Sequence, residues 1–415
     1  MSLRIAINAQ LSPNGGAGGT QTFLIGLIHA LARLDGPEQY VLIGPRKDPE
    51  WLKPYTGPNQ RIVRGPKIQA IKRALGPIKP LLRTLRRASF WKSGAQEIIP
   101  RMAASSGFYE KLDCSVIHFP YQHYVPSRVA AVFNPHDLQH VHYPEFFSAA
   151  DFEWREVTYR AACEAANTVV VHSNWVKQDL VRHYKLSPNK IQVILTPPPV
   201  QAYAEPTAET QEIVRTTYKV DNRFAFYPAV TWKNKNHIRL LEALALLRDR
   251  GTKIELICTG HQTDFFTEIQ KAVAQFKLHD EVRFLGMIPE EHLRAMYRLA
   301  EFTVLPTLFE GAGLPLVEAW AEGSPVTCSA VTSLLELAGD AALLFDPNSA
   351  ENMAGAIKRM AEDVSLRETL VKSGFARLRN FNWETTAKAY RAVYRCAAGG
   401  PLTEEDRYIL SAGRT

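Results

Sequence analysis

Two glutamates, Glu310 and Glu318, are separated by seven residues and flank a turn that contains Gly311 and Gly313. Apolar residues precede this turn and an apolar periodic segment follows it, which predicts that a strand ends here and a helix begins. The first turn of a helix leaves backbone N–H groups without partners, and the helix dipole adds partial positive charge. A phosphate or diphosphate can bind at such a turn.

The spacing of the two carboxylates suits a ligand with hydroxyl groups on both sides of a diphosphate. Eight residues at about 100° each come to about 80° beyond two full turns, so Glu318 lies near the face on which the helix starts. One carboxylate can then lie at the edge of the anion site while the other reaches deeper hydroxyls. A sugar nucleotide carries its groups in that order. The alternative is a surface helix whose acids only favour its N-terminal dipole.

The stretch from Phe309 to Ala319, with its Gly-x-Gly-Leu-Pro insert, resembles the Glu-seven-Glu signature of one enzyme family. This family is the retaining, GT-B-fold glycosyltransferases of the family-four type, also called glycosyl transferases group 1. The resemblance implies that Glu310 contacts the transferred sugar and that Glu318 binds the ribose hydroxyls. It also places the phosphate against turn amides and the base against a second loop: Gly311, Ala312, Gly313, Leu314, Gly286, Met287 and Ile288.

A glycine-rich loop, residues 14–20, follows the first predicted strand and precedes a helical pattern. Glycines let the backbone approach a ligand closely. The loop is not a dinucleotide fingerprint, because Gln21 stands where the third glycine belongs. The resemblance implies that Gly18 and Gly19 face the cleft near the donor phosphate and the acceptor. A glycine turn with a purely structural role is the alternative.

His136 stands in a His-Asp-Leu stretch just after a predicted strand. The resemblance implies that this histidine borders the sugar site. A retaining transfer without a covalent intermediate needs no strong general base, so we expect His136 to hydrogen-bond the sugar or to align the acceptor. A structural histidine is the alternative. His136 and His140 have no third ligand that would indicate a metal site.

The segment from Tyr227 to His237 resembles the family's phosphate-binding loop, in which an arginine and a lysine hold the leaving diphosphate. Lys235 matches the lysine, whereas Val230 occupies the position of the arginine. Lys233, or a base from another segment, is expected to supply the second charge, because bond cleavage places negative charge on the β-phosphate. No Asp-x-Asp occurs in the sequence, so we expect neither a metal ion nor another cofactor.

Short apolar runs alternate with helical patterns in two series, which predicts parallel sheets covered by helices on both faces. The first series predicts strands at 3–8, 40–43, 115–119, 129–133, 168–171 and 191–195, with helices at 22–33, 152–166 and 174–184. The second predicts strands at 224–227, 254–259, 282–285, 302–306, 326–329 and 342–345, with helices at 237–249, 263–276, 291–299, 316–322 and 350–362. The expected fold class is α/β, with two Rossmann-like doubly wound domains facing a central cleft, the GT-B arrangement.

The predicted domains follow from the break between the two series. Residues 1–195 are expected to form an N-terminal, acceptor-side domain, and 201–380 a C-terminal domain that binds the nucleotide sugar. The proline-rich run 196–200 is the expected linker, since consecutive prolines can neither continue a helix nor pair in a central strand. Residues 381–398 resemble the family's last helix, which crosses back to the N-terminal domain, and 399–415 are expected to be a tail.

The net charge of +7 over 415 residues is unevenly distributed, because eleven bases and no acid lie between Glu50 and Glu97. Residues 61–92 combine many of these bases with an apolar helical periodicity, which predicts a basic amphipathic insert. Such an insert suits an anionic membrane surface. A solvated helix whose apolar stripe is core is the alternative. Nucleic acid is not an expected partner, because no nucleic-acid-binding motif accompanies the bases.

The five cysteines are scattered without metal or disulfide spacing, which is typical of reduced thiols in a cytosolic protein. The chain begins without the apolar core of a signal peptide and contains no run of eighteen apolar residues. We therefore expect a cytoplasmic protein, peripheral to the inner face of the membrane if the basic insert binds there.

These observations predict a metal-independent, retaining hexosyltransferase that uses a nucleotide-sugar donor, with Glu310, His136 and Lys235 as its catalytic residues. The Trp-x-x-Lys-Asn-His variant of the phosphate loop resembles mannosyl-type bacterial members, so GDP-mannose is the first expectation for the donor. The expected acceptor is a hydroxyl of a glycan or a lipid-linked acceptor in bacterial surface polysaccharide synthesis. Two alternatives remain: a sugar-nucleotide epimerase of the same fold, and a nonenzymatic basic binding module.

Overall fold

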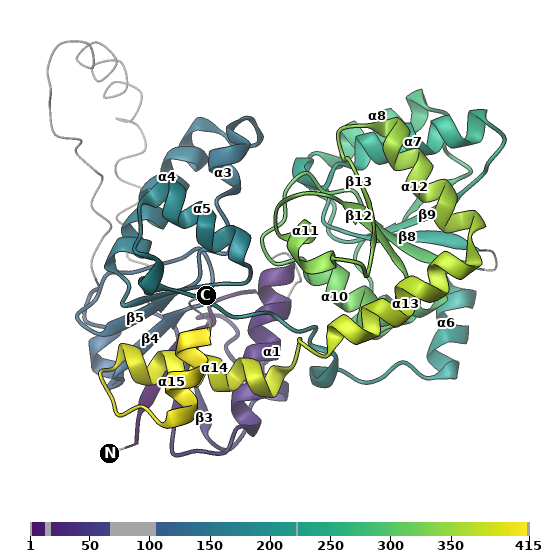
Figure 1. Ribbon diagram of the computed structural model, residues 1–415. Helices are drawn as coiled ribbons and strands as arrows, with labels where there is room; N and C mark the ends of the chain where they lie inside the picture. Colours follow the sequence, from purple (N-terminus) through teal and green to yellow (C-terminus); the bar gives the residue numbers. More distant parts are fainter. Residues whose placement is uncertain (1, 13–17, 67–104, 221–222, 413–415) are drawn as a thin grey trace, which may run out of the picture.

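The protein consists of two α/β halves, each built around one parallel β-sheet (Figure 1). The computed structural model describes residues 2–12, 18–66, 105–220 and 223–412. In these ranges the first sheet has seven strands and the second has six, and every strand pair is parallel. The expected class, α/β with two doubly wound units, is confirmed.

The first sheet has the order β3-β2-β1-β4-β5-β6-β7. Its strands are β1 (Arg4–Asn8), β2 (Gln39–Gly44), β3 (Gln60–Arg64), β4 (Val116–Phe119), β5 (Ala130–Phe133), β6 (Thr168–Val171) and β7 (Ile191–Val193). The strand order changes direction between β1 and β4. In open α/β sheets such a switch point opens a crevice at the carboxyl ends of the strands.

Helices connect these strands and cover the sheet. They are α1 (Gly19–Arg33), α3 (Gln139–His142), α4 (Ala149–Ala165) and α5 (Asn174–Tyr184), with 3₁₀ turns at Glu50–Tyr55, Glu110–Leu112, Pro144–Phe146, Pro188–Lys190 and Val200–Ala202. Serine side chains cap two of the helices: Ser148 accepts from the Asp151 amide, and Ser173 accepts from the Val176 amide. Helix α1 instead begins after Gly18, whose φ of 52° favours glycine.

The second sheet has the order β10-β9-β8-β11-β12-β13. Its strands are β8 (Phe224–Pro228), β9 (Glu255–Thr259), β10 (Val282–Phe284), β11 (Phe302–Leu305), β12 (Val326–Ser329) and β13 (Leu343–Phe345). The surrounding helices are α6 (Ala208–Tyr218), α7 (His237–Asp249), α8 (Phe266–Gln275), α9 (Glu290–Leu299), α10 (Leu314–Ala321), α11 (Thr332–Ala338), α12 (Ala350–Glu362) and α13 (Val364–Leu378), with a 3₁₀ turn at Lys233–Lys235.

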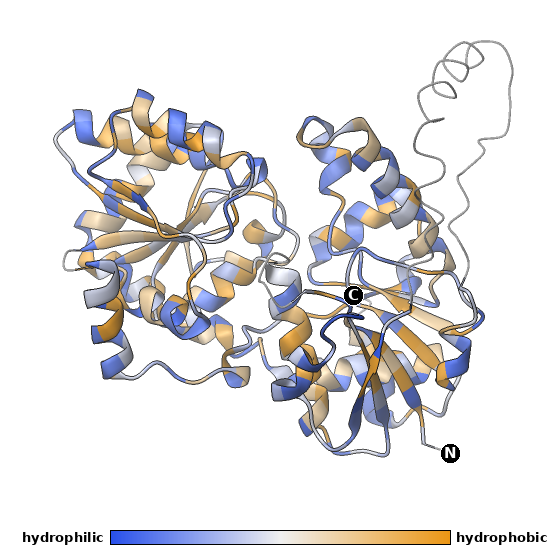
Figure 2. Ribbon diagram, turned by 180° about the vertical axis from the view of Figure 1, so that it is seen from behind, coloured by the Kyte–Doolittle hydropathy of each residue, from blue (hydrophilic) through white to orange (hydrophobic). Residues whose placement is uncertain are grey.

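The strands of both sheets are apolar and the helices that cover them expose polar faces (Figure 2). One buried cluster fills the second half, around Phe226, Leu256 and Val304. Two clusters fill the first half, one on each face of its sheet. Because each sheet is buried on both faces, the sequence of each of its strands is a continuous apolar run.

Helix α14 (Trp383–Ala397) leaves the second half and packs against the first (Figure 1). Its side chains Trp383, Tyr390 and Tyr394 belong to the same buried cluster as Phe23 of α1. The indole Nε1 of Trp383 donates to the carbonyl oxygen of Pro198 at 2.9 Å. The helix is thereby bonded to the chain segment that joins the two halves.

The expected tail, residues 399–415, contains a helix, α15 (Glu404–Ala412), which packs against α14. An ion-pair network fixes it, because Arg395 lies 2.8 Å from Asp406 and 2.6 Å from Glu38. The side chains of Glu38 and Asp406 are almost fully buried. Three acids in the first turn also favour a helix start at this point.

The prediction that a basic amphipathic insert occupies residues 61–92 is wrong at its start. Residues 60–64 form strand β3, which pairs in parallel with β2, and the β-branched Ile62 and Val63 suit this sheet position. Residues 67–92 of the insert lie outside the described residues.

The sequence prediction also omitted helices α6, α11 and α13, of which α11 has only seven residues. Within the described ranges, no helix is long and apolar enough to cross a membrane. All five cysteines are free of disulfide bonds.

Candidate functional site

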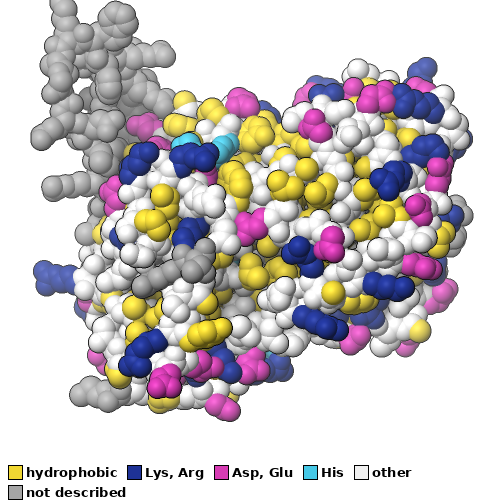
Figure 3. All heavy atoms as spheres, in the orientation of Figure 1, with side chains coloured by type: hydrophobic (Ala, Val, Ile, Leu, Met, Phe, Trp, Pro, Cys, Tyr) yellow, Lys and Arg dark blue, Asp and Glu magenta, His cyan; other side chains and the backbone are white. Residues whose placement is uncertain are grey.

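A cavity of about 430 Å³ lies between the two halves, at the carboxyl ends of both sheets. Loops after β1, β4, β5 and β6 form one wall, and loops after β8, β9, β10 and β11 form the other. On the face shown in Figure 3, hydrophobic side chains gather along the boundary between the halves. The predicted site residues in the cavity wall are Gly18, Gly19, His136, Lys235, Met287, Ile288, Glu310, Gly311, Ala312, Leu314 and Glu318.

Lys235 and Glu310 form an ion pair in this cavity, with Nζ 2.8 Å from Oε2. Both side chains are about four-fifths buried. The Lys235 backbone is fixed because its carbonyl oxygen accepts from the Tyr227 hydroxyl at 2.6 Å. Among the described residues that line the cavity, Lys235 is the only lysine or arginine.

The Glu310 backbone is fixed by the first two residues of α11. The Thr332 hydroxyl accepts from the Glu310 amide at 3.1 Å and lies 2.8 Å from its carbonyl oxygen, to which Ser333 donates at 2.7 Å. Thr332 adopts a φ of 43°, which is uncommon for a β-branched residue. The sequence prediction missed both hydroxyl residues, since no motif marks them and they lie 22 and 23 residues beyond Glu310.

Gly311 allows the halves to approach each other closely, and Gly18 lies near the second half. A Cβ added to Gly311 would stand 2.7 Å from the carbonyl oxygen of His136, so that position has no room for a side chain. A Cβ added to Gly18 would contact Val230 at 3.6 Å, in the position where the family carries arginine. Val230 therefore places an apolar side chain near the loop that precedes α1, where an arginine would place a charge.

The far end of the cavity holds two carboxyl groups, Glu318 of α10 and Glu290 of α9. Burial, assisted by the charge of Glu290, raises the pKa of Glu318 to about 8. Burial also raises the pKa of Glu290 to about 7, with Arg294 opposing this shift. The Tyr297 hydroxyl donates to Glu318 at 3.1 Å. This end of the cavity can thus receive hydroxyl groups and hold a variable negative charge.

Glu290 and Tyr297 were not predicted as site residues. The signal was present, because Glu290, Arg294 and Tyr297 recur at four- and three-residue steps from the start of α9 and so share one face of this helix. That face points toward Glu318 and Glu322, to which Tyr297 and Arg294 bond.

His136 lies in the cavity wall next to β5, with a φ of 66°. Its Nε2–H donates to the carbonyl oxygen of Pro120 at 2.9 Å, which leaves Nδ1 as an acceptor. Burial lowers the pKa of His136 to about 4, so its imidazole is neutral at pH 7. Its ring lies 5.2 Å from that of His172 and 5.8 Å from that of Phe23. A neutral imidazole can orient a hydroxyl group without acting as a strong base.

A buried hydrogen-bond network behind His136 joins the first sheet to α14. The amide Oδ1 of Asn134 lies 2.8 Å from the Nε2 of His118, and its Nδ2 donates to the Tyr390 hydroxyl at 2.8 Å. The Tyr394 hydroxyl lies 2.8 Å from the other ring nitrogen of His118. Burial lowers the pKa of His118 to about 3, so the network is neutral. The sequence did not reveal it, because its members come from β4, the residue after β5 and helix α14.

Three predicted donor contacts do not line the cavity: Lys233, Gly286 and Gly313. Lys233 is exposed, and its ammonium lies 5.9 Å from the centre of the Phe265 ring. Lys233 and Lys235 flank one 3₁₀ turn, so their side chains leave in different directions and only Lys235 enters the cavity. The carbonyl of Gly286 accepts from Gly260 at 2.8 Å, and Gly313 forms the N-cap of α10 against Leu337.

Two doubly wound sheets with a cleft between their carboxyl ends define the GT-B class. Two family models match the chain in series: Glycosyltransferase Family 4 over residues 17–202 and Glycosyl transferases group 1 over residues 209–377. Together they span most of the chain. The protein belongs to the group 1 glycosyltransferases of GT-B fold, as the Glu-seven-Glu resemblance predicted.

Similar proteins agree with this assignment. O-antigen chain mannosyltransferase B of Escherichia coli is 28% identical over 276 residues, which cover 65% of this chain and 72% of the relative. D-inositol 3-phosphate glycosyltransferase of Corynebacterium glutamicum (strain R) is 25% identical over 281 residues, 65% of this chain and 67% of the relative. The protein is accordingly a glycosyltransferase.

Solved structures share the fold over almost the whole chain. Sucrose-phosphate synthase from Thermosynechococcus elongatus superposes with a TM-score of 0.70 at 23% identity, over 95% of this chain and 98% of that chain. HepE of Anabaena, in complex with UDP and glucose, has a TM-score of 0.68 at 17% identity, over 95% of this chain and 100% of that chain. At these identities the likeness concerns the fold alone.

Proposed function

We propose that the protein transfers a hexosyl group, with retention of anomeric configuration, from a nucleotide sugar to a hydroxyl group of a glycan or lipid-linked acceptor. GDP-mannose is the proposed donor, and bacterial surface polysaccharide synthesis the proposed context. The main support for this proposal is the ion pair of Lys235 and Glu310. It lies in the cavity between the start of α1 and the start of α10, both of which contain glycine.

The proposed diphosphate site combines one side-chain cation with backbone amides. Lys235 faces the turn before α10, and Gly18 and Gly19 lie opposite, at the start of α1. A Cβ added to Gly19 would stand 3.7 Å from Leu314, so the starts of the two helices are close together. Helix N-termini attract anions through free N–H groups and the dipole. The two helix N-termini supply partial positive charge in place of the arginine whose position Val230 occupies. The proposed site therefore requires no second lysine or arginine.

The proposed sugar site lies between Glu310 and His136. The Glu310 carboxylate would accept from sugar hydroxyls, and the neutral His136 ring would orient the sugar or the acceptor. An acceptor hydroxyl attacks the anomeric carbon from the face that the phosphate leaves, so the new bond has the configuration of the old one. The departing β-phosphate oxygen takes the acceptor proton, while Lys235 stabilises the charge that develops there. No metal takes part in this scheme.

The residues at the proposed base site favour guanine over uracil as the base of the donor. Met287, Ile288 and Glu290 line the same part of the cavity as Glu318. An ionised Glu290 accepts hydrogen bonds only, and its two oxygens match the adjacent N1–H and 2-amino donors of guanine. Uracil offers a single N–H between two carbonyl oxygens, which a carboxylate repels. The mannosyltransferase relatives also favour a mannosyl donor.

A cytoplasmic location at an anionic membrane surface is part of the proposal and rests on the sequence charge between Glu50 and Glu97. Binding to vesicles at low salt tests it. We expect stronger binding to anionic than to neutral vesicles, whereas equal binding would contradict this part of the proposal.

The activity is tested by incubation with a panel of nucleotide sugars in the presence of a chelator. We expect nucleoside diphosphate release and transfer from GDP-mannose, the donor's anomeric configuration in the product by NMR, and a large loss of rate in Glu310→Gln. The exposed Glu368→Gln serves as a matched control. A changed sugar still attached to its nucleotide would indicate an epimerase. Turnover of no donor, with salt-dependent retention of nucleic acid, would indicate a basic binding module.

A further inference from the structure

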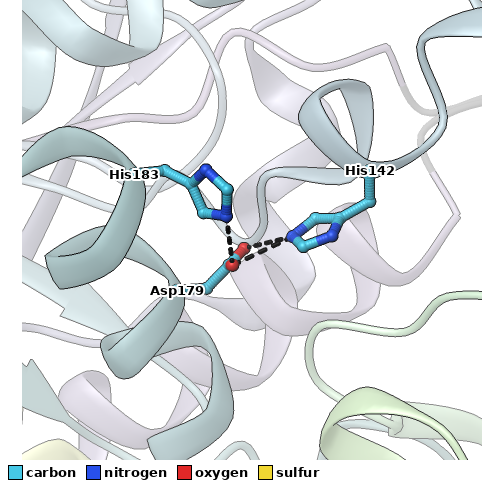
Figure 4. A group of neighbouring side chains, drawn as sticks. All are labelled: His142, Asp179 and His183. Carbon is cyan, nitrogen blue, oxygen red and sulfur yellow. Dashed lines mark hydrogen bonds and ion pairs between the residues drawn. The ribbon is translucent and has the colours of Figure 1, made fainter.

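Three side chains of types that can ligate a metal ion meet outside the cavity, on α3 and α5 (Figure 4). His142 Nε2 lies 2.9 Å from both carboxylate oxygens of Asp179, and His183 Nε2 lies 3.4 Å from Oδ1. One potential ligand atom from each residue lies within 4.8 Å of the others. The Asp179 side chain is only 3% exposed, whereas those of His142 and His183 are 28% and 32% exposed.

We propose that His142, Asp179 and His183 form a binding site for a zinc-type divalent cation, separate from the sugar-transfer chemistry. Two imidazole nitrogens and one carboxylate oxygen are a ligand set that Zn²⁺ prefers. Asp179 and His183 are four residues apart on α5 and therefore project from the same face of that helix. His142, at the end of α3, provides the third ligand. The exposed fractions of the two histidines leave the fourth coordination position to water.

The hydrogen-bonded geometry is close to what a cation requires. Ligand atoms about 2.0–2.1 Å from a tetrahedral ion are roughly 3.3 Å from one another, and the two histidine–carboxylate distances, 2.9 and 3.4 Å, bracket that value. The Nε2 of His142 donates to the Asp179 carboxylate, and the Nε2 of His183 lies 3.4 Å from it. On metal binding both nitrogens become ligands, so each neutral ring must carry its proton on Nδ1. The buried carboxylate also supplies the negative charge that a cation needs.

The position of the site links it to the boundary between the halves. The His142 ring packs 5.2 Å from the ring of Phe309, the residue before Glu310, and Trp175 contacts both rings. Tyr143, next to His142, donates to the Leu308 carbonyl oxygen at 3.2 Å. A cation held by α3 and α5 would therefore fix the His142 ring against the segment that carries Glu310.

The sequence did not reveal this set, because His142 and Asp179 are 37 residues apart. On the sequence alone, in which no Asp-x-Asp occurs, we expect neither a metal ion nor another cofactor, and the proposed site departs from that expectation. A cation at α3 and α5 is compatible with metal-independent transfer.

Titration of the chelator-treated full-length protein with Co²⁺ tests the proposal. We expect one Co²⁺ per chain with the visible absorption of a tetrahedral site, displaced by one equivalent of Zn²⁺, and a Zn²⁺-dependent rise in Tm. His183→Gln should lose the absorption and bind Zn²⁺ at least about tenfold more weakly. His183 is partly exposed, so this variant should fold, and its Tm without metal checks that point.

The exposed His279 provides the matched control, because His279→Gln removes one histidine from elsewhere on the surface. The Co²⁺ titration of His279→Gln should give the same absorption spectrum and stoichiometry as that of the wild type. Absence of a tetrahedral Co²⁺ spectrum in the wild type, or an unchanged spectrum in His183→Gln, would overturn the proposal and leave Asp179 as the partner of two histidines without a metal ion.

Discussion

The ammonium group of Lys235 lies 2.8 Å from the carboxylate of Glu310, at the junction of the proposed sugar and diphosphate sites. Each group partly neutralises the other within the cavity. A donor that binds as proposed brings phosphate oxygens to Lys235 and sugar hydroxyls to Glu310. The ion pair therefore holds the two groups side by side at the junction of the two proposed sites.

Lys235→Met should lower kcat by about 10²–10³-fold, because it removes the only side-chain cation that we place at the leaving β-phosphate. Steady-state kinetics with GDP-mannose measures the loss. Lys233→Met is the matched control and should retain near wild-type kcat, since Lys233 lies outside the cavity wall. Equal losses in the two variants would show that the structure assigns the wrong lysine.

Glu318 should make the protein less stable as the pH rises. Its pKa is about 8 in the folded chain against an ordinary value of 4.5, so the folded state holds a proton that the unfolded chain loses. The free energy of unfolding should therefore fall between about pH 4.5 and pH 8. Glu318→Gln, which mimics the protonated form, should match the wild type in Tm at pH 5 and exceed it at pH 8.

Glu290 has a raised pKa as well, so part of the decline should remain in Glu318→Gln. The exposed Glu368→Gln controls for the loss of one charge and should follow the wild-type curve. A Tm profile of Glu318→Gln that coincides with the wild type at every pH would contradict the assignment of a proton to Glu318.

Gly311→Ala should impair catalysis while leaving each half folded. The new methyl group would stand 2.7 Å from the His136 carbonyl oxygen, so the loop and the facing wall must separate. We expect kcat/KM to fall by about 10- to 100-fold, because small misplacements of reacting groups have effects of that size. Circular dichroism should show an unchanged fold.

Gly355→Ala is the control for Gly311→Ala, since a Cβ at Gly355 in α12 meets nothing within 4 Å. It should be fully active and more stable by about 0.5–1 kcal/mol. Wild-type kinetics in Gly311→Ala would mean that the two walls are not in the contact described.

Tyr390→Phe should destabilise the protein by about 1–3 kcal/mol, because the Nδ2 of the buried Asn134 loses its 2.8 Å acceptor. Urea unfolding measures the change in the free energy of unfolding. Tyr408→Phe is the matched control, since Tyr408 is 74% exposed, and it should be neutral. Equal stability of both variants would show that the network does not hold α14.

The sequence was sufficient to predict the residues that follow strands. Gly18, His136, Lys235 and Glu310 each lie near the carboxyl end of a strand, and the parallel topology brings such ends to one edge of a sheet. Glycine turns between apolar runs mark these places. The path of the backbone therefore follows from pattern and turn chemistry.

The direction of individual side chains could not be predicted in the same way. A single 3₁₀ turn decides that Lys235 enters the cavity and that Lys233 leaves it. Thr332 reaches the site from α11 without a sequence motif, so only tertiary packing reveals it. Glu290 of α9 had a sequence signal in its helical spacing to Arg294 and Tyr297, but that spacing does not show that the shared face meets the cavity. The tail was misjudged because α15 is stabilised by the pairing of Arg395 with Asp406, which the sequence does not display.

A crystal structure of the protein with GDP-mannose tests the central proposal most directly. We predict that the β-phosphate contacts Lys235 Nζ and the amides at the start of α10, the mannose contacts Glu310, and the guanine lies beside Glu290. A diphosphate bound away from Lys235, or held by a metal ion, would contradict the proposed mechanism.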